Sequence, residues 1–349
     1  MPSLNDLLMA KASLDVQIIL TILHMILWQI IISYIFYPIV VWIISNLKCK
    51  KQFLHFNRES FKKLINWDIG DDEEEQVKIV SEWEAGMSQH FFGGMLCLPL
   101  AIGLDPMLPF GIATAMACHG SLSEIGSEIG DMVKRCYEII FKGEEGRRKN
   151  PMNIMIILLM HHSCACCMVI PMNIFYRDNP YYAEISMLLQ LAAFIAFVCQ
   201  QYGFTLSMET HEGLRNMKIS LSINLLIIIW SRVIRFAVLL QILLMTMWED
   251  KNWFVLKFAV APLICMTLFN VLVLMDSSMK FAKFMPMHIK KHSMDEIKDL
   301  AVEAASAGRH TRSRQSFSGM NLSQRNWAKI RGVVRMGIVQ EPEKSKKME

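Results

Sequence analysis

Residues 17 to 45 form a long run of apolar side chains with few polar interruptions. A helix needs about 20 apolar residues to cross the hydrocarbon core of a bilayer, so this run can cross and still tilt. Further apolar segments follow at 88–104, 110–135, 152–175, 183–207, 219–247 and 253–276. With 53% apolar residues in 349, the chain has more such segments than a soluble domain of its size could bury. The sequence therefore predicts an all-α integral membrane protein, a bundle of about seven transmembrane helices.

The distribution of lysine and arginine predicts how these helices are oriented. Basic residues gather just after the first, third and seventh segments, and the opposite loops contain few. Because basic residues close to span ends stay in the cytosol, these loops are expected there, with the N-terminus in the lumen and the C-terminus in the cytosol. The second half of segment 110–135 is rich in acids and serines. This segment is still expected to cross, because the three basic loops lie on the same side of the membrane only if it does. The first span starts too late for a cleaved signal peptide and is expected to remain as an anchor.

Two polar stretches lie outside the apolar segments. Residues 46–81 form a cytosolic loop whose acidic run, DIGDDEEE, is expected to be a flexible, solvated linker. Residues 286–349 form a basic tail for which disorder is expected. Its last residues include Lys346 and Lys347, at the third and fourth positions from the end. On a cytosolic tail this pair matches the dilysine signal that vesicle coats bind, so the endoplasmic reticulum membrane is the expected location.

The cysteines do not indicate a metal site. Most of the nine cysteines fall inside predicted spans, where small polarizable packing residues explain them. In the cluster C-A-C-C at 164–167 the thiols are one and two residues apart and do not share a helix face. We expect no metal site, no tightly bound cofactor and no nucleic-acid partner.

Ionisable and amide side chains inside the predicted spans are the candidate functional residues. Such residues are costly in a membrane and usually face the interior of a bundle. His161 and His162 are the candidate catalytic pair, because a span that starts near residue 152 carries them roughly 15 Å deep. Gly126 and Gly130 have the small-xxx-small spacing that lets a neighbouring helix approach. The expected polar cavity residues are Glu124, Glu128, Asp131, Glu184, Asn224, Arg232 and Asn270.

Several ordered motifs between residues 82 and 285 resemble the TLC domain. These are EIGSEIGDM at 124–132, L-M-H-H at 159–162, E-I-S at 184–186, INLLIIIWSRVIR at 223–235 and FNVLVLMDSSMKFAKF at 269–284. The TLC domain occurs in ceramide synthases, in translocating-chain-associated membrane proteins and in other lipid-related proteins of the endoplasmic reticulum. The implied organisation is an anchor span at 1–45, a loop at 46–81, a TLC-like transmembrane domain at 82–285 and a tail at 286–349.

The resemblance implies roles for particular residues. His161 and His162 match the histidine pair with which ceramide synthases transfer a fatty acyl group from acyl-CoA to a sphingoid base. Asp131 and Glu184 match acidic positions of the family. The stretch after the histidines, 163–183, lacks the further motifs of ceramide synthases and is closer to the divergent TLC-domain proteins. Two functions follow: ceramide-synthase-like N-acyl transfer in sphingolipid or phospholipid metabolism, with acyl-CoA as co-substrate, or a non-catalytic lipid sensor or cargo receptor. Membrane lipids are the expected partners of either.

Overall fold

The computed structural model describes residues 2–289 and 339–340, and the chain divides into two compact units. The first unit contains residues 1–205 and 223–277 and is a helical bundle. The second unit contains residues 206–222 and 278–349. In it the two-residue strands β1 (His288–Ile289) and β2 (Val339–Gln340) pair in antiparallel register. Lys346 and Lys347 lie outside the described residues.

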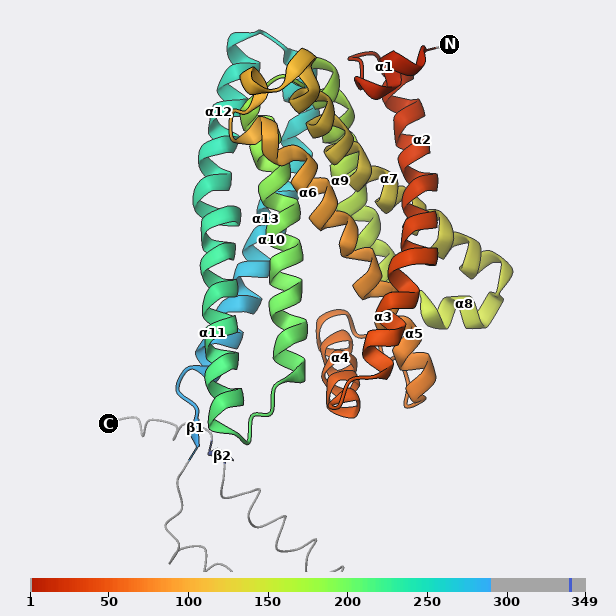
Figure 1. The fold of residues 1–349 in the computed structure, drawn as a ribbon, viewed down its shortest axis with the longest axis vertical. Helices are drawn as coiled ribbons and strands as arrows, with labels where there is room; N and C mark the ends of the chain where they lie inside the picture. The colour runs from red at the N-terminus through yellow and green to blue at the C-terminus, as the bar shows by residue number, and fades with distance from the viewer. Residues whose placement is uncertain (1, 290–338, 341–349) are drawn as a thin grey trace, which may run out of the picture. The chain divides into compact units, whose positions relative to one another are not determined.

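Helices make up nearly all of the regular structure, and Figure 1 shows their order along the chain. Two of the long segments contain a π-helical turn, which inserts an extra residue into the backbone hydrogen-bond ladder. In chain order the helices are α1 (Leu4–Leu8), α2 (Leu14–Ile31), a π turn (Ile32–Phe36), α3 (Tyr37–Ser45), α4 (Lys50–Ile65), α5 (Glu73–Gly86), α6 (Ser88–Ala101), two short 3-10 turns (Asp105–Met107 and Pro109–Gly111), α7 (Ile112–Phe141), α8 (Gly143–Lys149), α9 (Met152–Phe175), α10 (Pro180–Thr205), α11 (His211–Ile228), a π turn (Ile229–Ile234), α12 (Arg235–Glu249) and α13 (Trp253–Phe284).

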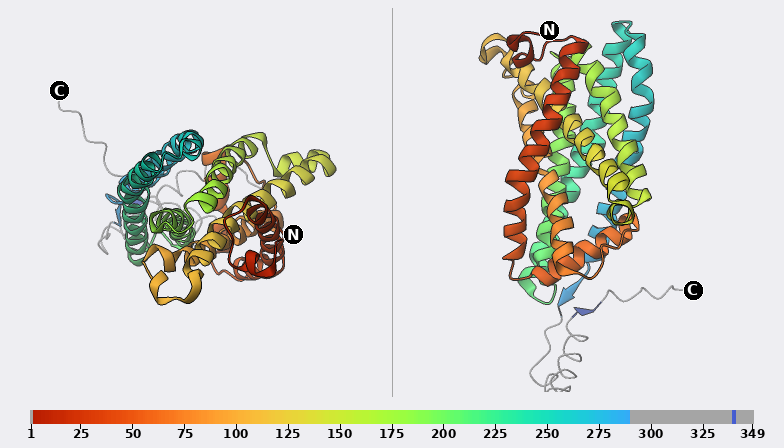
Figure 2. Two further views of the ribbon diagram at one scale, coloured as in Figure 1. Left: turned by 90° about the horizontal axis from the view of Figure 1, so that it is seen from above. Right: turned by 90° about the vertical axis from the view of Figure 1, so that its right-hand side faces the viewer.

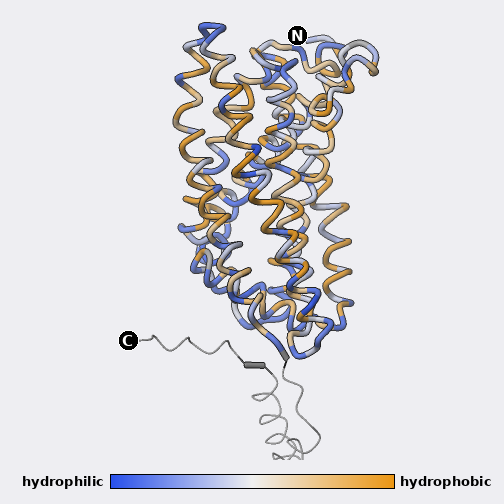
Figure 3. Tube along the Cα trace, turned by 90° about the vertical axis from the view of Figure 1, so that its left-hand side faces the viewer, coloured by the Kyte–Doolittle hydropathy of each residue, from blue (hydrophilic) through white to orange (hydrophobic). Residues whose placement is uncertain are grey.

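The described chain contains 5 helical segments that are long and apolar enough to cross a membrane. They are Leu14–Ser45, Met152–Phe175, Pro180–Thr205, His211–Glu249 and Trp253–Phe284. Apolar side chains remain exposed on these helices, as on α2, where exposed isoleucines recur every fourth residue from Ile18 to Ile30. Figure 3 shows apolar residues along the middle of the long helices and polar residues toward their ends. These features identify the chain as a multi-pass helical membrane protein.

The predicted number of seven spans is not confirmed, because α6 and α7 are not among the helices that are long and apolar enough to cross a membrane. Helix α6 has 14 residues and is about 21 Å long at 1.5 Å per residue, which is less than a hydrocarbon core of about 30 Å. Helix α7 has 30 residues but carries many polar ones. The two helices pack against each other as a hairpin. Whether this hairpin crosses the membrane stays a prediction.

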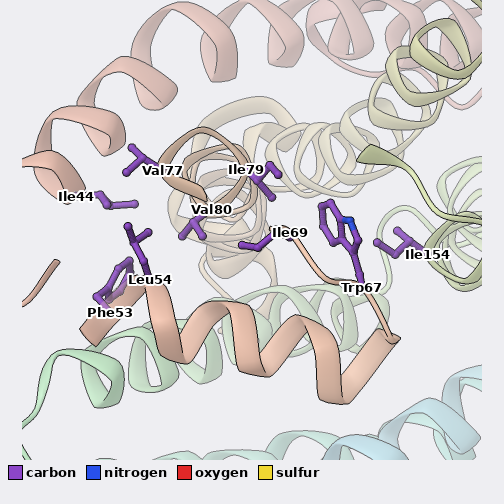
Figure 4. Close-up of a cluster of buried hydrophobic side chains, with 9 residues drawn as sticks. All are labelled: Ile44, Phe53, Leu54, Trp67, Ile69, Val77, Ile79, Val80 and Ile154. Carbon is purple, nitrogen blue, oxygen red and sulfur yellow. The ribbon is translucent and has the colours of Figure 1, made fainter. Parts of the chain in front are cut away.

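The expectation of a flexible linker around the acidic run is wrong. Residues 46–87 contain α4 and α5, which pack on α3 and on Ile154 of α9 through a cluster of buried side chains shown in Figure 4. This cluster consists of Ile44, Phe53, Leu54, Trp67, Ile69, Val77, Ile79, Val80 and Ile154. The acidic run begins α5, because the Asp72 side chain accepts a hydrogen bond from the Glu74 backbone and the glutamates occupy the first turn. Negative charge is favourable at a helix N-terminus.

Ion pairs join this segment to itself and to the loop after α7. Arg58 pairs with Asp68 at 2.8 Å and also with Asp71. Its hydrogen bonds to Asp68 lower the pKa of that carboxyl to about 2. Arg148 of α8 contacts Glu75 of α5 at 2.9 Å. The loops after the first and third apolar segments therefore lie together at one end of the bundle.

Candidate functional site

Helix α7 is the central element of the candidate site, and its small residues explain why other helices can surround it. An added Cβ at Gly126 or Gly130 would lie under 3 Å from atoms of α2, and one at Gly120 would meet α6. This confirms the expectation that the Gly126 and Gly130 pair admits a neighbouring helix. Another face of α7 carries Glu124 and Glu128, one turn apart, toward α9.

Glu128 and the histidine pair form a compact cluster between α7 and α9. Oε1 of Glu128 lies 3.4 Å from Nε2 of His161 and 3.1 Å from Nδ1 of His162. The side chain of Glu128 is 6% exposed, compared with 26% for His161 and 12% for His162. Within the described chain no group outside this cluster donates a hydrogen bond to either Glu128 oxygen. His90 of α6 interacts electrostatically with all three residues.

Arg232 supports the cluster from the π turn between α11 and α12. The His161 ring stacks on Phe269 of α13 with centroids 5.2 Å apart. The Arg232 guanidinium lies 5.8 Å from the centre of the same ring. Arg232 is buried and donates to Oδ1 of Asn270 at 3.0 Å and to the carbonyl oxygen of Leu189 at 3.0 Å. The π turn thus carries a buried cation, and π turns inside helices occur frequently at functional sites.

An apolar cavity of about 110 Å³ begins next to this cluster. Glu124 lies at its wall, one turn before Glu128, and Cys164 and Ala165 lie there one turn after the histidines. Four residues of helix rise span about 6 Å, so the cavity starts one turn from the cluster on both helices. The remaining lining comes from α9, α10, α12 and α13: Met168, Val169, Met172, Tyr182, Ile185, Ser186, Leu189, Phe236, Leu240, Leu243, Leu244, Met247, Pro262, Leu263 and Met266.

A buried hydrogen-bond network near Tyr182 was not predicted from the sequence. Oδ1 of Asn173 accepts from the Tyr182 hydroxyl at 2.9 Å and from Ser121 at 3.1 Å. The Asn173 amide donates to Oε1 of Gln17 at 3.0 Å. These side chains join α2, α7, α9 and α10. Gln17 and Asn173 are polar residues at the edges of apolar runs, which is the signal that could have indicated this network.

The structure brings only some of the predicted site residues together. Glu128 contacts His161 and His162, Glu124 lines the cavity, and Arg232 donates a hydrogen bond to Asn270. The others have separate partners: Asp131 pairs with Arg135 at 2.7 Å, Glu184 forms a two-point pair with Arg235 at 2.6 and 2.7 Å, and Asn224 contacts Ser277 at 3.4 Å. Those three residues do not line the cavity.

Figure 2 shows the bundle from above and from the side, with α2 and α12 on opposite sides and α10 between them. Helices from both halves of the chain line the cavity, and the side chains of Glu128, His161 and His162 are mostly buried. Comparison of the chain with protein-family models, with curated proteins and with solved structures gives no match.

Proposed function

We propose that this membrane protein holds a lipid acyl chain in its apolar cavity and acts in sphingolipid or phospholipid metabolism. The observation that carries the proposal is the position of the cavity, which starts one helical turn from Glu128, His161 and His162. Aliphatic and methionine side chains form most of its wall, and ligand sites typically combine such walls with a few polar groups. An acyl chain fits this chemistry, with its polar end toward Glu124 and the cluster.

The reaction proposed for the cluster is N-acyl transfer of the ceramide-synthase kind, on the strength of the TLC resemblance. The amine nitrogen of a sphingoid base attacks the thioester carbonyl of acyl-CoA, a C–N bond forms and the C–S bond breaks. His161 and His162 provide the acid–base group that takes the amine proton and returns it to the leaving thiolate. Glu128 holds the rings in place at 3.1 and 3.4 Å.

A non-catalytic lipid sensor or cargo receptor is the second candidate. It is favoured by the pairing of Glu184 with Arg235, because this acid is one of the positions that the family resemblance links to the site. Such a protein needs the cavity but not the reactive cluster. Substitutions in the cavity and in the cluster therefore separate the two functions.

Lipid analysis of cells provides the test. Cells lacking the protein are compared with cells that carry His161→Ala plus His162→Ala, or Ala165→Phe, which fills the cavity wall. For an acyltransferase, all three should show the same lipid change, with turnover reduced by about 100-fold or more for the histidine variant. His24→Ala plus His119→Ala is the matched control, since these rings also touch, at 3.1 Å, but lie outside the cluster around Glu128.

The lipid results expected for an acyltransferase differ from those expected for a lipid sensor or cargo receptor. If Ala165→Phe reproduces the deletion while the histidine variant behaves as the unchanged protein, the sensor or receptor function is supported and catalysis is rejected. If deletion leaves lipid composition unchanged, both proposals fail.

We further propose residence in the endoplasmic reticulum with a lumenal N-terminus, seven spans and retrieval through Lys346 and Lys347. N-glycosylation acceptor sites inserted at residues 103, 144 and 180 should be modified at 103 and 180 only. The attached glycans should stay of the high-mannose type, and changing both lysines to Ser should convert them to processed forms. An unmodified site at 103 would mean that the α6–α7 hairpin does not cross, and modification at 144 would contradict the orientation.

A further inference from the structure

Three metal-binding side chains converge in the bundle interior. Nε2 of His161, Nδ1 of His162 and a carboxylate oxygen of Glu128 lie within 4.8 Å of one another. Neighbouring residues on a helix point about 100° apart, so two adjacent histidines rarely reach one point. Here they do, because His161 uses the far nitrogen of its ring and His162 uses the near one.

The distances suit a tetrahedral metal ion. Zinc binds imidazole nitrogen and carboxylate oxygen at about 2.0 to 2.2 Å, so two such ligands at the tetrahedral angle are about 3.3 to 3.6 Å apart. The Glu128 oxygen lies 3.4 Å from the His161 nitrogen and 3.1 Å from the His162 nitrogen. Both values are close to that spacing.

Hydrogen bonding within the described chain does not satisfy this cluster. Apart from their contacts with each other at 3.1 and 3.4 Å, both oxygens of Glu128 and both ring nitrogens of His162 are buried without a hydrogen-bond partner in the described chain. A buried polar group without a partner is costly, and a buried charge more so. Arg232 does not supply the partner, because it donates to Asn270 and Leu189 instead. A cation placed among the three side chains would satisfy the carboxylate and both imidazoles at once.

We propose that Glu128, His161 and His162 bind one divalent transition-metal ion of the zinc type. Two histidines and one carboxylate form a common ligand set of catalytic zinc sites, in which water takes the fourth position. Nitrogen ligands favour zinc and its neighbours over magnesium or calcium. The proposal departs from the sequence-based expectation of no metal site, which stays a prediction.

The inference deepens the proposed function, on which its catalytic meaning rests. A coordinated imidazole cannot accept a proton, so the histidines would act as ligands and the metal-bound water would be the acid–base group. Metal binding itself does not depend on any lipid reaction. A measurement of metal content therefore tests the site separately from the function.

The test is elemental analysis of the full-length protein, purified in detergent without a polyhistidine tag or chelator. Roughly one zinc-type ion per chain is expected. Glu128→Gln and His161→Ala plus His162→Ala should each lower the affinity for added Zn²⁺ by more than about 100-fold, since even indirect support of a ligand contributes 10- to 100-fold. The His24→Ala plus His119→Ala control should keep the full metal content, and monodisperse elution shows that each variant folds.

Cobalt substitution identifies the ligands by a second route. Co²⁺ in the unchanged protein should give the visible absorption of a tetrahedral site without an intense thiolate band, although Cys164 and Cys166 lie nearby in sequence. A chain that elutes folded with no metal, and binds no added Zn²⁺ or Co²⁺, overturns the proposal. If the unchanged protein binds no metal but His161→Ala plus His162→Ala still abolishes lipid turnover, the proposed function stands without the metal.

Discussion

Replacing Gly126 with alanine is expected to destabilise the bundle by about 1 to 3 kcal/mol, the usual cost of overpacking a tightly packed interior. An added Cβ would lie 2.7 Å from the Cβ of His24 and 2.8 Å from the backbone nitrogen of Met25. Backbone atoms cannot rotate away as a flexible side chain can. Helix α2 would therefore have to move away from α7. Reversible unfolding of the detergent-solubilised protein in increasing sodium dodecyl sulfate measures the loss.

The matched control for this substitution is Gly86→Ala. Gly86 ends α5, and an added Cβ there meets no atom within 4 Å. Alanine is the better helix former by about 0.5 to 1 kcal/mol, so this change should be neutral or stabilising. Equal losses at both positions would show that the close approach of α2 and α7 is not what limits stability.

For the glycine pair, the sequence predicts a close contact with a helix but does not identify that helix. The spacing of Gly126 and Gly130 predicts a close helix contact, which the structure contains. The partner helix could not be predicted, because α2 is about 100 residues away in sequence and glycine spacing contains no information about the opposing surface. Glu124 and Glu128 are four residues apart, a spacing that puts them on one face of a helix, and in the structure both lie toward α9.

Asp131 and Glu184 were predicted to lie in the cavity, but each pairs with an arginine and neither lines it. Asp131 is three residues beyond Glu128, and Arg135 follows it by four, a spacing at which opposite charges on a helix meet. That local pair was visible in the sequence and takes Asp131 away from the cavity. The Glu184 and Arg235 pair joins α10 to α12 across 51 residues, so only the folded chain reveals it.

The acidic run at 68–75 was misinterpreted for a different physical reason. Its charge density favours a solvated linker when it is considered alone. However, it contains Ile69 and lies between Trp67 and Val77, and these three side chains belong to the cluster buried against α3 and α9. Burial of these side chains outweighs the cost of ordering the segment, and the acids occupy the start of α5, where they are favourable.

Substitution of Arg232 by methionine should have the second large effect, a loss of about 2 to 5 kcal/mol in stability. Methionine has a similar volume but no donors, so Oδ1 of Asn270 and the carbonyl oxygen of Leu189 would lose the hydrogen bonds that they accept. Hydrogen bonds to charged groups contribute about 1.5 to 3 kcal/mol each. Glu124 would also lose the positive charge with which it interacts across the cavity wall. The same unfolding measurement in sodium dodecyl sulfate reports the change.

Arg58→Met is the control for charge removal alone, because Arg58 pairs with partly exposed acids outside the predicted spans, and such pairs contribute about 0 to 1 kcal/mol. Arg232→Lys separates charge from geometry. A lysine keeps the cation but lacks the planar fork that lets Arg232 donate to two acceptors on different helices. It should therefore recover only part of the loss and should shift Phe269, on which both the guanidinium and the His161 ring rest. Full recovery by Arg232→Lys would mean that the buried charge, rather than the two hydrogen bonds, holds α13 and α10 to the π turn.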